Sequence, residues 1–294
     1  MTAATVTKFK LVDHGVTLEF MELDQALQIL CMCHVELVRL MGSSANWPFP
    51  ATLDGLLPFP PGWKLSHDAI RYHMDAIFSA LETAKASLVE RGKALAEWQV
   101  TLLQIIVRDL YRNVHQHVQH KRHTLFPWMS TRVDLPAKML DYDEATLLAL
   151  LDRVRQLCES VSSGATASAK RAVGELHSAF LVLRTLLRQQ MEREELLGLP
   201  LLRKHFTARE AAALEKKRVA AMKPHDLAWL LRPLAEAEKK ETLTRLGFPL
   251  LLQKLLLLPA LRRADRAALR AHRELASGER LGPALPPRRC GRDV

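Results

Sequence analysis

The sequence predicts an all-α protein. Leu, Ala, Arg and Glu dominate it, β-branched runs are scarce, and only 6% of the residues are aromatic. Long amphipathic stretches with short connectors recur along the 294 residues, a length that can bury a large core. We therefore expect an antiparallel up-down four-helix bundle, with an extra helix before it and further helices after it.

Prolines and small-residue linkers divide the chain into four parts. Residues 1–61 are expected to hold one amphipathic helix, over residues 18–42, and a Pro-rich connector. Residues 62–206 are expected to form the bundle, and residues 207–275 a C-terminal helical extension. The last part, residues 276–294, has the composition of a disordered basic tail.

The first two bundle helices are marked by breaker residues. Ser66 is a plausible N-cap for a helix over residues 66–91, which Gly92 follows. The second helix is expected over residues 93–126 and should stop at Pro127, because proline cannot continue a helix without losing a hydrogen bond.

The third and fourth bundle helices follow the same logic. The third is expected over residues 142–161, after a loop at residues 133–142. A small-residue linker at residues 162–168 leads to the fourth, whose apolar stripe begins near Glu175 and ends near Pro200. Three more helices are expected in the extension, over residues 207–222, 224–246 and 249–273.

Composition also indicates the cellular compartment of the protein. The cysteines, Cys31, Cys33, Cys158 and Cys290, form no CxxC pair and no disulfide framework, so a reducing environment is expected. The start of the chain lacks the apolar core of a signal peptide. The most apolar run, residues 248–261, is too short and too interrupted to span a bilayer. We expect a soluble, cytoplasmic protein without membrane insertion.

The net charge of +10 lies in the last third of the chain. From Leu201 onward 21 Lys and Arg residues stand against 10 Asp and Glu residues. Such a balance attracts nucleic acid or another anionic surface. Because aromatic residues are not interleaved with these charges, the sequence favours a solvated basic face over nucleic-acid binding.

Polar residues interrupt the apolar stripes at one level of the expected bundle. In an up-down arrangement the starts of the first and third helices share an end with the ends of the second and fourth. The inward polar positions at this end are His67, His117, Lys121, Glu144, Gln190 and Glu194. His177 lies thirteen residues before Gln190, or roughly 20 Å at 1.5 Å per residue, so we interpret it as structural.

Three motifs around this layer resemble the hemerythrin-like, or HHE cation-binding, family. His67 opens the run HDAIR, which is similar to the first-helix motif of the family. His117 stands ten residues before Pro127 of LFPW, which resembles the second-helix motif. The runs MEREE (191–195) and LPLL (199–202) are similar to the end of the fourth helix. The resemblance covers roughly residues 62–215.

The resemblance implies a non-haem iron site. Members of the family bind two irons through His and carboxylate ligands, for O₂ binding, iron or redox sensing, or iron handling. This chain departs from the pattern where Lys121 replaces a Glu and Gln190 replaces a His. The ligands it retains are His67, His117 and Glu194, with Glu144 as the nearest match for a third-helix His.

Two functional hypotheses remain open. In the first, the bundle binds non-haem iron through the reduced site. In the second, it is a metal-free protein-interaction or regulatory module for a protein partner, in which Lys121 pairs with Glu194 or Glu144 and replaces the charge of the metal. An enzyme is not expected, because the chain has no Gly-rich phosphate loop and no HExxH motif.

Overall fold

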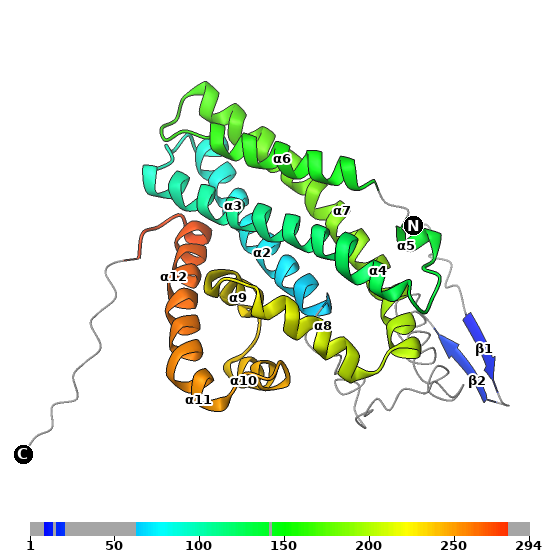
Figure 1. Ribbon diagram of the computed structural model, residues 1–294. Coiled ribbons are helices and arrows are strands. Elements are labelled where there is room, and N and C mark those ends of the chain that lie inside the picture. The colour runs from blue at the N-terminus through cyan, green and yellow to red at the C-terminus, as the bar shows by residue number, and fades with distance from the viewer. Residues whose placement is uncertain (1–8, 14–15, 21–62, 141–142, 282–294) are drawn as a thin grey trace, which may run out of the picture.

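A computed structural model of the chain describes residues 9–13, 16–20, 63–140 and 143–281 (Figure 1). Within these residues the fold is helical, as predicted, apart from one β-hairpin. In the hairpin, strand β1 (Phe9–Asp13) pairs antiparallel with strand β2 (Val16–Phe20). None of the described helices combines the length and the apolar character that crossing a bilayer requires.

The hairpin differs from the helix expected near the N-terminus. Leu18, where that helix was expected to begin, lies in β2 opposite Leu11. Apolar residues alternate at Val16, Leu18 and Phe20, which is the period of a strand. The rest of the expected helix, residues 21–42, lies outside the described residues, as do the Pro-rich connector and the end of the basic tail.

Four long helices dominate the fold. They are α2 (Trp63–Lys85), α3 (Glu97–His120), α6 (Glu144–Ser160) and α7 (Ala167–His205). Helix α2 packs against α3 and α7, and α6 packs against the same two helices (Figure 1). Each long helix therefore contacts two others, which encloses a shared interior between them.

Two of these helices continue through π-helical turns. Turn η2 (Ala86–Glu90) extends α2, and η3 (Lys121–Leu125) connects α3 directly to α4 (Phe126–Met129). The expected stop at Pro127 was therefore wrong. Pro127 lies in the first turn of α4, where the missing N–H is least costly.

Helix α7 is longer than its apolar stripe predicts. Thr166 caps it, and it passes through Pro200 to end at His205. Packing of the neighbouring Leu199 and Leu202 into a buried cluster offsets the backbone hydrogen bond that Pro200 cannot donate. The expected loop before the third helix also contains a short helix, α5 (Ala137–Leu140).

The C-terminal extension is also helical. Its elements are α8 (Ala208–Ala220), α9 (Pro224–Leu231), α10 (Glu236–Arg245), α11 (Leu250–Leu252), the π-turn η4 (Gln253–Leu257) and α12 (Leu258–Ser277). Thr207 caps α8, as predicted, and forms a capping box with Glu210. The single helix expected over residues 224–246 is divided instead into α9 and α10.

The extension packs directly onto the long helices. Helices α9 and α12 both contact α2. The His73 ring stacks on Trp229 with 4.2 Å between ring centroids, and its Nε2 lies 3.1 Å from the Trp229 carbonyl oxygen. Burial lowers the pKa of His73 well below its ordinary value, so the ring is neutral and donates through Nε2.

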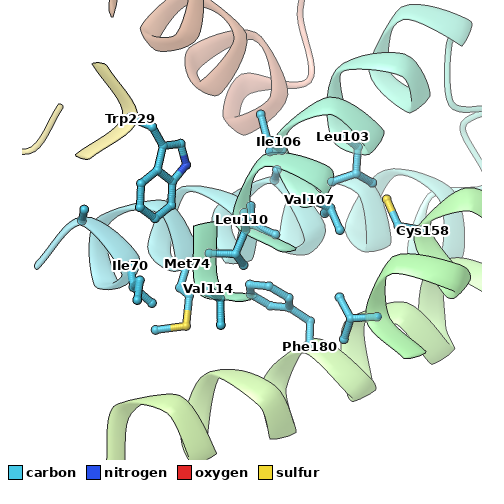
Figure 2. Packing of buried hydrophobic residues seen from close by; sticks show 14 of the residues in the cluster. Ile70, Met74, Leu103, Ile106, Val107, Leu110, Val114, Cys158, Phe180 and Trp229 are labelled. Carbon is cyan, nitrogen blue, oxygen red and sulfur yellow. The ribbon is translucent and has the colours of Figure 1, made fainter. Parts of the chain in front are cut away.

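Buried apolar side chains form two clusters. The main cluster joins the four long helices to the extension (Figure 2). Its members in Figure 2 include Ile70, Met74, Leu103, Leu110, Val114, Phe180 and Trp229. The smaller cluster consists of Trp63, Leu125, Phe126, Met129, Met139, Leu199, Leu202, Phe206 and Ala211.

The close approach of α7 to Trp63 predicts a cost for any side chain at Gly198. A Cβ atom there would lie within 2.6 Å of Trp63 Cζ3. We expect Gly198→Ala to lower the free energy of unfolding by about 1–3 kcal/mol, measured by urea denaturation. In the matched control Gly174→Ala, on the same helix with nothing within 4 Å, we expect a gain of about 0.5–1 kcal/mol. Equal effects would contradict this packing.

Candidate metal centre

A layer of polar side chains separates the two apolar clusters. On α2, His67 lies between Trp63 of the smaller cluster and Ile70 of the main cluster. Lys121 and Glu194 meet His67 from η3 and α7, and all three residues are at most 2% exposed. The smaller cluster therefore lies between this layer and the outer end of the long helices. Buried polar groups of this kind require partners.

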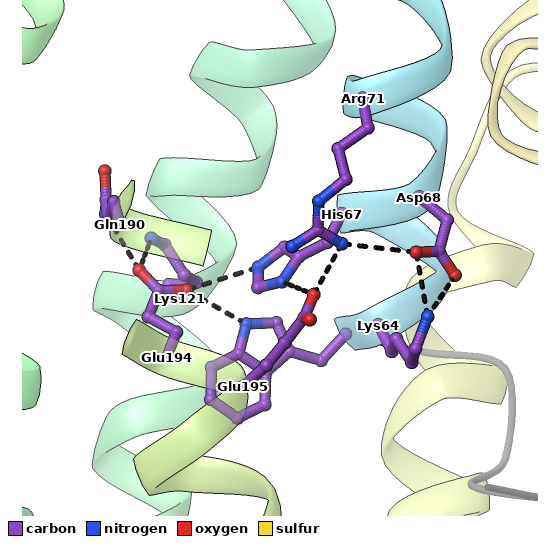
Figure 3. Close-up of polar contacts among 9 residues, drawn as sticks. Lys64, His67, Asp68, Arg71, Lys121, Gln190, Glu194 and Glu195 are labelled. Atoms are coloured by element: carbon purple, nitrogen blue, oxygen red, sulfur yellow. Dashed lines mark hydrogen bonds and ion pairs between the residues drawn. The ribbon is translucent and has the colours of Figure 1, made fainter. Parts of the chain in front are cut away.

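The Glu194 carboxylate is the centre of the layer (Figure 3). Its Oε1 accepts hydrogen bonds from the Lys121 ammonium and from Gln190 Nε2, the latter at 2.8 Å. Its Oε2 accepts from Trp63 Nε1 at 3.2 Å and lies 3.2 Å from His67 Nε2. Groups from three segments of the chain thus surround one buried carboxylate.

These contacts keep Glu194 ionised. Burial raises the pKa of Glu194, but the charge of Lys121 and the contact with His67 outweigh burial and lower the pKa to about 2. The carboxylate is therefore negative at neutral pH, and the buried Lys121 ammonium is its closest positive partner.

His67 is oriented by a second carboxylate, Glu195. Nδ1 of His67 lies 2.7 Å from Glu195 Oε1, which also accepts a hydrogen bond from Arg71 at 2.8 Å. Burial raises the pKa of Glu195, but these two partners outweigh it and lower the pKa to about 2. Because an ionised carboxylate only accepts hydrogen bonds, His67 carries a proton on Nδ1.

The other ring nitrogen of His67, Nε2, has an incomplete environment. No hydrogen bond satisfies it, although Glu194 Oε2 is only 3.2 Å away. A proton or a metal ion between His67 and Glu194 would satisfy both atoms, and a carboxylate that orients a ligating histidine is a common feature of metal sites.

His117 brings a third ligand to the same point. Its ring lies 5.0 Å from the His67 ring, edge to face, and its Nε2 is buried without a hydrogen bond. Burial, followed by the nearby charge of Lys121, lowers the pKa of His117 well below its ordinary value, so the ring is neutral. Ligand atoms of His67, His117 and Glu194 all lie within 4.8 Å of one another.

Most of the predicted layer therefore exists. His67, His117 and Glu194 are brought together, and the predicted ion pair between Lys121 and Glu194 is present. Gln190 joins the layer by donating to Glu194.

Two other predicted positions lie apart from this group. The inclusion of Glu144 was wrong, because its carboxylate forms an ion pair with the exposed Arg122 at 3.2 Å and is not part of the converging set. Glu144 is the first residue of α6, and its side chain is 22% exposed. His177 contacts Glu82 and likewise lies outside the converging set.

Sequence reasoning missed three contributors: Trp63, Arg71 and Glu195. Trp63 and Arg71 lie four residues before and after His67, so both share its helix face. Glu195 directly follows Glu194, and consecutive helical residues usually point in different directions. The helical spacing from His67 was the signal that could have identified the first two.

A cleft of about 80 Å³ reaches this layer from the side. His117 and His120 of α3 line it, together with Arg218 of α8 and Trp229 of α9. Burial and then the charge of Arg218 lower the pKa of His120 to about 4, so both histidines are neutral at pH 7. The cleft gives a small solute access to His117 between the long helices and the extension.

Compared with known proteins, the chain matches no protein-family model, no curated protein and no solved structure. The resemblance to hemerythrin-like proteins therefore rests on the three sequence motifs alone.

The buried ion pair predicts a strong energetic coupling. Lys121→Met leaves the Glu194 charge without its ammonium, and Glu194→Gln does the reverse, so each should cost about 3–5 kcal/mol of unfolding free energy. We expect the double variant to cost clearly less than the sum of the two. Urea denaturation measures all three, with Lys93→Met, on the surface, as a neutral control. Additive losses would contradict the pairing.

The two carboxylates predict a loss of stability in acid. Their pKa values of about 2, against an ordinary 4.5, mean that only the unfolded chain binds these protons between those values. The stability they contribute is therefore present above pH 4.5 and is lost as the pH falls toward 2. The lowered pKa of His117 acts in the same direction below 6.5. Unfolding free energy should fall with pH, less steeply in Glu195→Gln below 4.5.

Proposed function

We propose that this protein is a hemerythrin-like up-down four-helix bundle that binds one transition-metal ion through His67, His117 and Glu194. The observation that carries the proposal is the convergence of two histidine rings and one ionised carboxylate, whose ligand atoms lie within 4.8 Å of one another. Two histidines and one carboxylate form a recognised ligand set for non-haem iron. The motif resemblance makes iron the first metal to test.

The topology proposed for the bundle is supported by which helix ends meet. The start of α2 contacts the end of α3 through His67 and His117, and the later part of α7 through His67 and Glu194. At the other end, Leu95, before α3, pairs through its backbone with Gly164, before α7. These contacts are those of an up-down bundle, in which α3 and α7 run in the same direction and α2 runs in the opposite direction.

The residues present fit a single ion better than two. Ligand atoms about 2.1 Å from one metal ion lie at most about 4.2 Å apart, so a small inward movement of these side chains suffices. Glu195 accepts a hydrogen bond from His67 Nδ1 and would orient the ring so that Nε2 is available to a bound ion. Lys121 holds the remaining oxygen of Glu194 and occupies the place of a second cation.

Three protein ligands leave coordination positions open, so a bound metal would supply a place for a small molecule such as water or O₂. The remaining contributions come from the protein. The smaller apolar cluster shields the layer from solvent, and the cleft beside His117 and His120 provides the route by which a small ligand enters.

Metal content tests the proposal directly. The untagged protein, expressed with added iron, should contain about one metal ion per chain by elemental analysis, as three converging ligands imply. His117→Gln should lose this metal. The control His123→Gln, which removes an exposed histidine of the same helical segment, should keep it. Equal losses in both variants, or no metal in a folded wild-type protein, would contradict the metal site.

Replacing the ammonium tests why only one ion is expected. Lys121→Glu removes a positive charge beside the ligands and adds a carboxylate, so metal affinity should rise by at least about tenfold. The apo variant should be destabilised by two adjacent buried carboxylates and rescued by metal, giving a larger metal-induced rise in Tm than the wild type shows. Unchanged affinity would contradict the proposed role of Lys121.

A second candidate function is favoured by the Lys121–Glu194 pair itself. The Lys121 ammonium supplies a positive charge to Glu194, and Trp63, Gln190 and His67 also contact this carboxylate. The layer can therefore be stable without a metal. The bundle would then be a protein-interaction or regulatory module. A metal-free, folded wild type whose Lys121→Met variant unfolds readily would support this candidate over the first.

A further inference from the structure

Four large apolar side chains are exposed near the start of α12. Leu250, Leu251, Leu255 and Leu256 are each between 62% and 70% exposed. They lie on α11 and η4, and we call them the leucine tip. Figure 1 places α11 at an outer corner of the molecule, away from α6. Contiguous exposed apolar residues of this kind mark interaction surfaces.

The leucine tip is held outward by a buried amide. Gln253 is 1% exposed, and its Nε2 donates to Thr244 Oγ1 at 3.1 Å and to the Phe248 carbonyl at 2.8 Å. In the same segment Leu258 and Leu261 face the main cluster. Turning the tip inward would break the hydrogen bonds of Gln253 and expose this second set of leucines. Exposure of the tip is therefore built into the fold.

Positive charges accompany the exposed leucines. Lys254 lies among them, and the exposed Arg263 and Arg266 follow on α12. Arg263 is seven residues after Leu256, or roughly 10 Å along the helix. When the leucines enter a bilayer surface, the cations that follow them along the helix are therefore left beside the lipid headgroups.

We propose that the leucine tip docks on an anionic membrane surface. The leucines enter the boundary between headgroups and acyl chains, and Lys254, Arg263 and Arg266 contact lipid phosphates. A deformable lipid surface fits leucines that project from a corner of the molecule, and the cations give it charge complementarity. The contact is peripheral, because no described helix is able to cross a membrane. This proposal does not depend on the metal site.

Vesicle sedimentation with the full chain tests the proposal. The protein should bind vesicles of phosphatidylcholine that contain phosphatidylglycerol, and bind pure phosphatidylcholine weakly. Leu251→Ser/Leu255→Ser should weaken binding by roughly tenfold or more, because the variant lacks two of the leucine side chains that lipid would bury. The control Leu181→Ser/Leu186→Ser removes two exposed leucines from α7 and should leave binding unchanged.

The contribution of the positive charges to vesicle binding is tested separately. Arg263→Gln/Arg266→Gln should weaken binding by roughly fivefold per residue, and added salt should weaken wild-type binding, because the attraction to anionic lipid is screened. Circular dichroism checks that each variant remains helical.

Several outcomes would overturn the proposal. These are absence of binding to both kinds of vesicle, equal binding to both, or equal losses in the leucine-tip variant and the α7 control. A dimer in light scattering that Leu251→Ser/Leu255→Ser dissociates would instead assign the leucine tip to contact between two copies of the chain.

Discussion

The layer at one end of the long helices depends on the cost of burying the Glu194 carboxylate. An ionised carboxylate without solvent requires hydrogen-bond donors and a positive charge. Trp63 and His67 approach it from α2, Lys121 from the π-turn after α3, and Gln190 from its own helix α7. Because these contacts have specific geometry, they fix the relative rotation and register of the three segments in a way that apolar packing alone does not.

The same requirement limits what the layer binds. Lys121 already supplies one positive charge to Glu194, so the layer has less need of a metal than a site composed only of carboxylates and imidazoles. It still contains two imidazole nitrogens without hydrogen bonds, on His67 and His117, beside the ionised oxygen. An added cation would satisfy these atoms. The proposed single metal ion follows from this combination. Lys121 already pairs with the Glu194 carboxylate, whereas the two imidazole nitrogens still lack a partner. π-helical turns often occur at functional sites, and Lys121 opens one.

Sequence alone predicted the helical class and the principal residues of the layer, because a polar side chain in an apolar stripe is informative wherever a helix is buried. Glu144 was assigned wrongly because a helix start is often solvated, and its partner Arg122 lies on the outside. The continuation of α7 past Pro200 depends on tertiary packing that compensates the missing N–H group, which local propensity does not encode. Trp63 was missed as a donor because its role depends on Gly198, far away in the sequence, leaving space for its ring.

Anomalous diffraction from crystals grown with iron, recorded at the iron absorption edge, tests the central claim most directly. The account predicts one peak, within bonding distance of His67, His117 and Glu194, with the Lys121 ammonium still in contact with the other oxygen of Glu194. Two peaks, with Lys121 displaced from Glu194, would contradict the role of the ammonium as the second cation. A map without a peak, in which His67 bridges Glu194 and Glu195, would contradict the metal site itself.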